Sequence, residues 1–470
     1  MFKSIFFTVI IFSLISCAPF QNHDTKINIE QQPSYDLKQA LHDLVAKKDT
    51  APTEISGIQM VLIKKGQVAF EHAEGFARID SNKYKIPLTI DHKVRIASIS
   101  KFVLTMAFMS LVEEGKIDLD EDVSKYTGFE LINKNYPQQK ITIRHLLSHT
   151  SSIRDAGYYF LPLSENYHDF FRPSMHYENG AHFSKEPNQG PGKYFTYTNL
   201  NFGILAGIIE NISGMRMDIF VQEKLFKPLQ LNISFNVCDL FENNFSTLAT
   251  LYRRGEGGSV WEPNGQWKSQ VDGNRLGCFY GDEKINRTTV PDKSKLSSYQ
   301  IASNPTLFSP QGGLRASAKD LAKLMLLMIG NQNNSDDQKL QNIISKSSID
   351  AMLTPVWSFD EKLKNGDTGG EISINKASKF RLMSSYGLST HIIDLKDWGL
   401  TTTSKRLYGH LGSAYGLLGQ FWFDPITEDG MVILITGVGD DPAKPQNTTP
   451  LHAIEEVVLK MAILGLEEYR

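Results

Sequence analysis

The sequence has no apolar run long enough to cross a membrane and no strong excess of charge of either sign. The first absence argues against a membrane-spanning protein, and the second against a nucleic-acid-binding protein. The N-terminal apolar stretch, residues 5–16, is shorter than the roughly 20 residues that a membrane-spanning helix needs. Basic residues number 49 and acidic residues 52, so the chain lacks the broad basic surface typical of nucleic-acid-binding proteins. Its 470 residues are 41% hydrophobic, which predicts a globular protein with a sizeable core.

Several sequence motifs of known catalytic sites are also missing. The chain contains neither the Gly-x-Ser-x-Gly turn of α/β-hydrolases nor a glycine-rich phosphate loop of the Walker type. His145 and His149 have the spacing of zinc-binding histidines, but Leu146 stands where the zincin motif requires glutamate. A structural role is favoured for both histidines, and the sequence predicts no metal and no cofactor.

The N-terminus has the pattern of a bacterial lipoprotein signal. Lys3 supplies a positive charge, residues 5–16 form the apolar region, and Leu14-Ile15-Ser16-Cys17 resembles a lipoprotein cleavage site. We therefore expect a signal peptide over residues 1–16, lipidation at Cys17, a polar tether over 17–33 and a catalytic domain over 34–470. An ordinary secretory signal is the alternative. Both interpretations export the protein, and the first anchors it to the membrane of the cell envelope.

Cysteine is scarce, at three residues in the whole chain. Lipidation of Cys17 would leave Cys238 and Cys278, which can pair in an oxidising compartment. Sequence spacing does not measure the distance between two cysteines, so the disulfide remains open.

What the chain does contain is an activated-serine motif, Ser98-Ile99-Ser100-Lys101. A serine hydroxyl needs a neighbouring base to attack a carbonyl, and a lysine three residues along one helix lies within reach. The apolar run 102–112 predicts a helix that is buried nearly all round, ending at Gly115. Burial lowers a lysine pKa and lets lysine act as a base. A second match, Ser373-Ile374-Asn375-Lys376, follows a Gly/Asp-rich segment and is interpreted as a surface loop.

Two more short motifs follow in order along the chain. Tyr197-Thr198-Asn199 leads directly into a helical pattern over residues 202–210, whereas a second Tyr-x-Asn match at Tyr177 does not. His410-Leu411-Gly412 is the only His-x-Gly in the sequence.

These three motifs, in this order, resemble the serine β-lactamase and penicillin-binding protein family, in particular its class C β-lactamase, D-alanyl-D-alanine carboxypeptidase and related esterase branch. The stretches 143–152 and 310–321 and the hairpin near Gly57 resemble the same branch. The resemblance covers roughly residues 50–465. It implies an α/β (α+β) protein of the β-lactamase/transpeptidase-like fold, in which helices flank an antiparallel sheet and a helical lobe is inserted.

The same resemblance implies the catalytic roles. Ser98 would be the acylated nucleophile, and its own N–H would form half of the oxyanion hole. Lys101 would keep the hydroxyl proton mobile. Tyr197 would carry that proton to the leaving group and later activate the water that hydrolyses the acyl-enzyme.

The implied substrate-binding residues are Asn199, His410, Gly412 and Ser413. Asn199 would hold a substrate carbonyl, the strand carrying His410 and Gly412 would lie beside the acyl group, and the Ser413 N–H would complete the oxyanion hole. The best-known β-lactamases carry lysine where this chain has His410. Histidine is mostly uncharged near neutral pH, which favours peptidase or esterase activity over β-lactamase activity. Lys405 and Arg406 could restore some positive charge.

The coarse architecture follows from periodicity. We expect a helix over 37–46, a hairpin of strands 58–63 and 68–74, mainly helical structure over 92–225, a helix over 318–328, strands over 417–423 and 431–438, and a closing helix from Pro450. The first hairpin and the last strands would share one sheet, with the active site between that sheet and the helical lobe. Residues 230–305 could form a wall of the site or an irregular covering loop.

The sequence therefore predicts an exported serine hydrolase that acts through a Ser98 acyl-enzyme on an ester, a D-amino peptide of peptidoglycan type or, less favoured, a β-lactam. The competing hypotheses are a penicillin-recognising or cell-wall-binding module with little turnover, and a structural envelope lipoprotein, which would leave the ordered motifs unexplained. The oligomeric state is not predicted.

Overall fold

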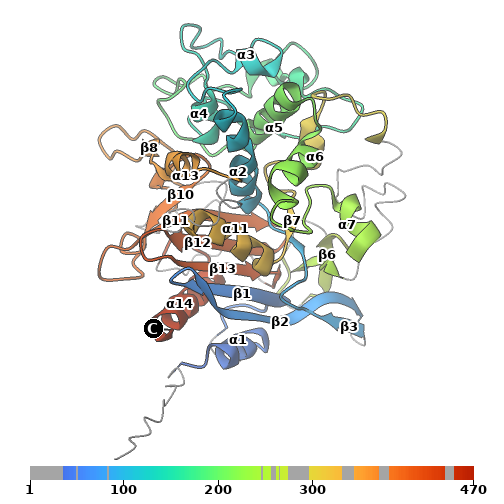
Figure 1. The fold of residues 1–470 in the computed structure, drawn as a ribbon, viewed down its shortest axis with the longest axis vertical. Coiled ribbons are helices and arrows are strands. Elements are labelled where there is room, and N and C mark those ends of the chain that lie inside the picture. The colour runs from blue at the N-terminus through green and yellow to red at the C-terminus, as the bar shows by residue number, and fades with distance from the viewer. Residues whose placement is uncertain are drawn as a thin grey trace, which may run out of the picture. The chain divides into compact units, whose positions relative to one another are not determined.

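A large antiparallel sheet with helices on both faces lies at the centre of the compact unit Tyr35–Arg470 (Figure 1). The structure is a computed structural model that describes residues 35–48, 51–81, 84–244, 247–255, 261–263, 265–273, 296–330, 343–369, 381–439 and 449–469. Cys17, Cys278 and the second Ser-x-x-Lys match lie outside these ranges. Among the described residues, no helix is both long enough and apolar enough to cross a bilayer.

The main sheet contains nine strands among the described residues, in the order β3-β2-β1-β13-β12-β11-β10-β9-β8. Neighbouring strands are antiparallel, and β1 pairs with β13, so the first hairpin and the last long strands share one sheet as predicted. The strands are β1 Gly57–Lys64, β2 Gln67–Ser81, β3 Tyr84–Pro87, β8 Trp357–Ser358, β9 Ser385–Tyr386, β10 His391–Asp394, β11 Arg406–Ala414, β12 Leu417–Asp424 and β13 Asp429–Ile435.

Two smaller sheets lie beside the main one. The first pairs β4 Val94–Arg95 with β7 Arg315–Ala316, and the second joins β14 Gly437–Val438, β5 Leu251–Arg254 and β6 Trp267–Val271. The predicted strand 431–438 is therefore divided between β13 and β14, because the chain leaves the main sheet after Ile435 and pairs in parallel with β5.

The central strands are buried on both faces, which explains why most of their residues are apolar. On β1, Ile58, Met60 and Leu62 pack in the core beside α1 Leu37–Val45 and α14 Ala453–Glu468. Val61 and Ile63 point the other way, into the core of α2 Ile99–Glu113 and α11 Ala318–Gly330. Because successive strand side chains alternate between faces, one sheet stabilises two hydrophobic cores.

The helical lobe stands above the sheet in Figure 1, and α2 leads into it. Helix α2 is buried along almost its whole length, and Gly115 follows its C-cap with φ +67°, as predicted. The remaining helices in the described part of the chain are α3 Ser124–Thr127, α4 Ile143–Leu147, α5 Leu200–Ser213, α6 Met217–Val221, α7 Val237–Asn244, α13 Lys346–Leu353, the π-helix η3 Gln222–Phe226 and the 3-10 helices η1 Tyr167–Phe170, η2 Glu178–Gly180 and η5 Pro305–Phe308.

The prediction that residues 92–225 are mainly helical is wrong for residues 128–198. Only short helical turns occur there, and the segment is held instead by bonds from buried side chains to the backbone. Asn133, for example, donates to Ser184 O at 3.0 Å, and Asn304 donates to Leu161 O at 3.0 Å. Side chains of this kind compete with helical hydrogen bonding and favour turns.

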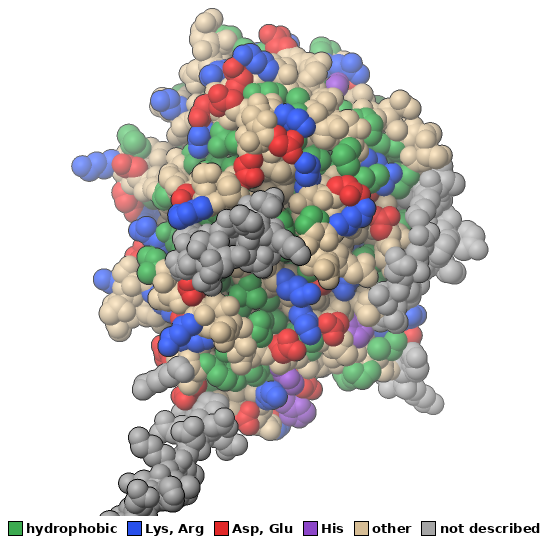
Figure 2. Space-filling model, in the orientation of Figure 1, with side chains coloured by type: hydrophobic (Ala, Val, Ile, Leu, Met, Phe, Trp, Pro, Cys, Tyr) green, Lys and Arg blue, Asp and Glu red, His purple; other side chains and the backbone are tan. Residues whose placement is uncertain are grey.

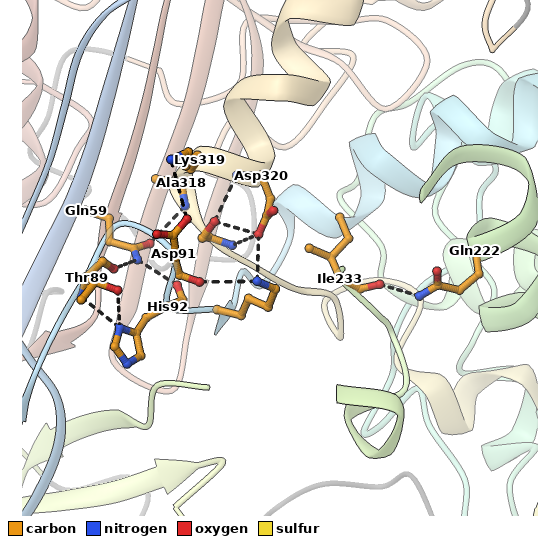
Figure 3. Close-up of polar contacts among 11 residues, drawn as sticks. Gln59, Thr89, Asp91, His92, Gln222, Ile233, Ala318, Lys319 and Asp320 are labelled. Carbon is orange, nitrogen blue, oxygen red and sulfur yellow. Dashed lines mark hydrogen bonds and ion pairs between the residues drawn. The ribbon is translucent and has the colours of Figure 1, made fainter. Parts of the chain in front are cut away.

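A buried polar network holds the segment that precedes Ser98 (Figure 3). Gln59 of β1 donates to Thr89 O at 2.6 Å and to His92 O at 2.8 Å, and it accepts the first N–H of α11, from Ala318, at 3.1 Å. Lys93 also lies 3.6 Å from Asp320 of α11. The network thus fixes both strands of the β4–β7 pair, and β4 leads into the turn that carries Ser98.

The segment over residues 230–305 is only partly described. It contributes α7, β5 and β6, with Arg253 over the Trp261 ring at 4.7 Å. Cys238 is disulfide-bonded, and Cys278, with which the sequence left a disulfide open, lies outside the described residues. On the face drawn in Figure 2, acidic and basic side chains are interspersed, in keeping with the near balance of charge in the sequence.

Candidate active site

Ser98 lies at the turn between β4 and α2, next to its predicted base. Ala97 before it adopts a left-handed conformation with φ +49°, which is uncommon for a residue with a side chain and typical of functional turns. Ser98 is 7% exposed and Lys101 is fully buried. Lys101 Nζ lies 2.9 Å from Ser98 Oγ, so the structure brings the two residues into direct hydrogen-bond contact.

Two further contacts of Lys101 explain how it can receive a proton. Its Nζ donates to Asn199 Oδ1 at 2.8 Å and to Gln311 O at 2.9 Å. Those oxygens can only accept, whereas a serine hydroxyl can also donate. A neutral Lys101 amine therefore satisfies both with its two N–H groups and keeps its lone pair for the Ser98 proton.

Tyr197 lies against Lys101, just before α5. Lys101 Nζ sits 4.7 Å from the Tyr197 ring centroid, and the ring centroids of Tyr197 and His410 are 6.1 Å apart. The three ordered motifs thus meet in one place, although they come from α2, the start of α5 and β11.

Asp155 orients Asn199, and sequence reasoning missed it. Its carboxylate accepts the Asn199 N–H at 2.9 Å, the Asn199 side-chain amide at 3.0 Å and the Leu200 N–H at 2.8 Å. The carboxylate caps the first turn of α5 and turns Asn199 Oδ1 toward Lys101. Asp155 lies three residues beyond the family-like stretch 143–152, which was the nearest available signal.

Two buried arginines hold the loop that carries Gln311. The sequence analysis did not predict this role for either of them. Arg95 donates to Gly312 O at 3.0 Å, and Arg315 donates to Gly313 O at 2.8 Å. Asp272 pairs with Arg315 through two bonds, at 2.9 and 3.1 Å, with both side chains 1% exposed. This anchoring keeps the Gln311 carbonyl in contact with Lys101.

His410 is buried and has both ring nitrogens bonded inside the protein. Nδ1 contacts Leu411 O at 2.5 Å, and Nε2 contacts the Tyr386 hydroxyl at 2.9 Å. A carbonyl oxygen only accepts, so the proton lies on Nδ1 and Tyr386 donates to Nε2. Burial and the nearby Lys101 hold the pKa of His410 well below its usual value, so the ring is neutral at neutral pH.

Gly412 brings β11 against the turn that carries Ser98. A Cβ on Gly412 would lie 2.5 Å from Ile96 O, closer than packed atoms allow, and 3.3 Å from Ile99 Cγ1, a tight contact. The predicted close approach is therefore made to the chain's own backbone beside Ser98. Ser413 follows on the same strand, in register with Leu418.

The other sequence candidates lie outside this cluster. Arg406 is in register with Asp394, four residues along β11 from His410, or about 13 Å at strand spacing. His145 caps α4, and His149 follows that helix, so the two histidines do not share a helix face. Within the described ranges, no cluster of side chains suited to a metal ion occurs.

The fold has close counterparts among solved structures. The octameric penicillin-binding protein homologue from Pyrococcus abyssi is 22% identical, with a TM-score of 0.59 over 91% of this chain and 77% of that chain. D-amino acid amidase from Ochrobactrum anthropi SV3 is 16% identical, with a TM-score of 0.60 over 93% of this chain and all of that chain. These similarities show the β-lactamase/transpeptidase-like fold.

Sequence comparison identifies the family. Protein flp of Staphylococcus aureus (strain MRSA252) is 28% identical over 189 residues, which are 40% of this chain and 36% of that protein, so the match spans about a third of the relative. The sequence model of the Beta-lactamase family matches residues 43–454, a range that holds the Ser98–Lys101 pair, Tyr197 and His410. The chain belongs to the Beta-lactamase family.

Proposed function

We propose that this protein is a serine hydrolase that cleaves an ester or a D-amino amide bond through an acyl-enzyme on Ser98, and that it prefers substrates with no carboxylate facing β11. The observation that carries the catalytic part is the 2.9 Å contact between Lys101 Nζ and Ser98 Oγ. In this proposal, Lys101 takes the Ser98 proton and Tyr197 passes a proton to the leaving group. Asn199, Gly412 and Ser413 line the acyl group, and the N–H groups of Ser98 and Ser413 hold the oxyanion.

The state of His410 supports the substrate preference. A β-lactam or a carboxypeptidase substrate carries a carboxylate that a fixed cation on this strand would bind. His410 offers neither a charge nor a spare N–H, because both of its ring nitrogens bond within the protein. Esters and amides need no such cation, and one fold neighbour is a D-amino acid amidase. A β-lactam is therefore the least favoured substrate class.

We expect His410→Lys to change the substrate preference. A buried ammonium at this position gains a charge-assisted hydrogen bond with a substrate carboxylate, a contribution of roughly 1.5–3 kcal/mol. The ratio of kcat/KM for a D-alanyl-D-alanine peptide to that for its C-terminal amide should rise about tenfold or more. Steady-state kinetics on this matched pair measures the ratio.

Thr403→Lys serves as the control, because it adds the same charge at an exposed position before β11. The control should leave the ratio unchanged. An unchanged ratio in His410→Lys as well, with hydrolysis of both substrates retained, would contradict the role assigned to His410.

We further propose that the protein is exported and anchored to the membrane by a lipid on Cys17. Lys3, the short apolar stretch and Leu14-Ile15-Ser16-Cys17 support this, as does the disulfide at Cys238, since such bonds persist in oxidising compartments. Mass analysis of the mature N-terminus tests it: a diacylated Cys17 is expected, and an unmodified N-terminus elsewhere would contradict the anchor.

A further inference from the structure

His149 is a buried residue beside Tyr197 to which the proposed chemistry assigns no part. The two rings stack, with centroids 4.3 Å apart and an interplanar angle of 27°. Rings of Phe195, Phe202 and Tyr386 surround the imidazole at centroid distances of 5.8, 5.7 and 5.2 Å. His149 therefore occupies a rigid aromatic site directly behind the phenol of Tyr197.

His149 also bonds to the residues on both sides of Tyr197. Its carbonyl oxygen accepts the Thr196 N–H at 2.9 Å, and its Nδ1 accepts the Thr198 N–H at 3.0 Å. One residue thus holds the backbone before Tyr197, the backbone after it and the face of its ring. The Tyr197 phenol cannot tilt without disturbing at least one of these contacts.

The backbone conformation of His149 and the state of its Nε2 are energetically unfavourable, and a residue that only filled space would need neither. His149 has φ +57°, a left-handed conformation that is unfavourable for a residue with a Cβ. Its Nε2 is buried and makes no hydrogen bond within the described part of the chain. Strain and unsatisfied polar atoms of this kind persist where the surrounding structure uses them, often at active sites.

The ring is neutral, which suits a position next to a lysine base. Because Nδ1 accepts a hydrogen bond, the proton lies on Nε2. Burial is the main cause, and together with the nearby Lys101 it holds the pKa of His149 well below its usual value. A neutral imidazole therefore supports Tyr197 without placing a second positive charge beside Lys101.

We propose that His149 is a positioning residue that holds the Tyr197 phenol in the orientation needed to protonate the leaving group. The inference rests on the proposed role of Tyr197. In the step concerned, the Ser98 oxygen has bonded to the substrate carbonyl carbon and its proton has passed to Lys101. The bond to the leaving oxygen or nitrogen then breaks as the Tyr197 hydroxyl donates its proton to that atom, and Lys101 returns a proton to Tyr197.

The test compares two aryl acetates that leave the same acetyl-enzyme. Phenolate is a poor leaving group and needs a proton, whereas 4-nitrophenolate leaves readily without one. In His149→Asn and His149→Phe, kcat/KM for phenyl acetate should fall roughly 10- to 100-fold, with a much smaller loss for 4-nitrophenyl acetate. Asparagine tolerates positive φ and keeps an acceptor for Thr198, while phenylalanine keeps the stacked ring, so the pair separates the two contacts.

His168→Asn is the matched control. His168 also has a buried Nε2 that bonds to none of the described residues, and a close aromatic neighbour, Phe129 at 4.0 Å, but it lies in η1. It should not change the ratio between the two esters. Equal losses on both esters in folded His149 variants would indicate a general structural role and overturn the proposal.

A double-mutant cycle tests the role of His149 separately from the proposed proton-carrier role of Tyr197. In a Tyr197→Phe background, His149→Asn should add no further loss on phenyl acetate, because His149 acts through the missing hydroxyl. A full additional loss would overturn the His149 role alone. If Tyr197→Phe itself spares phenyl acetate hydrolysis, the proton-carrier role of Tyr197 fails, and the His149 role fails with it.

Discussion

Replacing Lys101 with arginine or methionine is expected to lower kcat/KM for ester hydrolysis by roughly 10³-fold. Arginine keeps the positive charge but cannot be deprotonated in a protein, so it cannot take the Ser98 proton. Methionine has a similar size but no proton-accepting nitrogen. Losses of similar size in both variants would show that Lys101 acts as a base and not only as a fixed charge. Steady-state hydrolysis of 4-nitrophenyl acetate measures the effect.

The control for this substitution is Lys64→Arg, at a lysine that pairs with Asp429 at 2.8 Å at the end of β1. It should retain full activity. Thermal unfolding of each variant checks the fold, because methionine leaves Asn199 Oδ1 and Gln311 O without their donor. A folded Lys101→Arg enzyme with near-normal activity would show that lysine is not the base.

Replacing Asp272 with asparagine is expected to destabilise the protein by about 3–5 kcal/mol. The side chains of Asp272 and Arg315 are both 1% exposed. The substitution removes the carboxylate that faces Arg315 and leaves the charge of the buried guanidinium uncompensated. Arg315 also holds the Gly313 carbonyl, so the loop that presents Gln311 O to Lys101 should lose its anchor. Urea unfolding gives the stability change, and hydrolysis well below the unfolding midpoint gives the change in activity.

Asp120→Asn is the matched control. Asp120 makes the same two-bond contact with Arg144, but the side chains are 65% and 32% exposed. Solvent screening limits such a pair to about 1 kcal/mol or less. If the two variants lost equal stability, burial of the Arg315–Asp272 pair would not be what makes it important.

The site residues predicted from the sequence are those that lie together in short motifs. Ser98 and Lys101 lie within one helical turn, and Tyr197 and Asn199 directly precede a helix. The sheet strands were recognisable because burial on both faces makes β1, β12 and β13 mostly apolar, with Gln59 and Gln420 as polar exceptions in β1 and β12. In each case, the sequence pattern and the structural feature that it predicts lie in the same short stretch of the chain.

The supporting residues could not be predicted in this way, because each acts across a long separation in sequence. Asp155 bonds Asn199 from 44 residues away, and Asp272 pairs with Arg315 from 43 residues away. The Gln311 carbonyl that contacts Lys101 lies 210 residues from it. The family-like stretches 143–152 and 310–321 adjoin Asp155 and contain Gln311, but nothing in them indicates which side chain or carbonyl each residue contacts.

The most direct test of the account is the intact mass of a chain that begins after Cys17, treated with a serine-directed fluorophosphonate and compared with Ser98→Ala. The arrangement of Lys101 against the Ser98 hydroxyl predicts one adduct on the unmodified chain and none on the folded variant. No adduct on a folded, unmodified chain would contradict an activated serine and favour a binding module. An adduct that persists in Ser98→Ala would show that the nucleophile is a different residue.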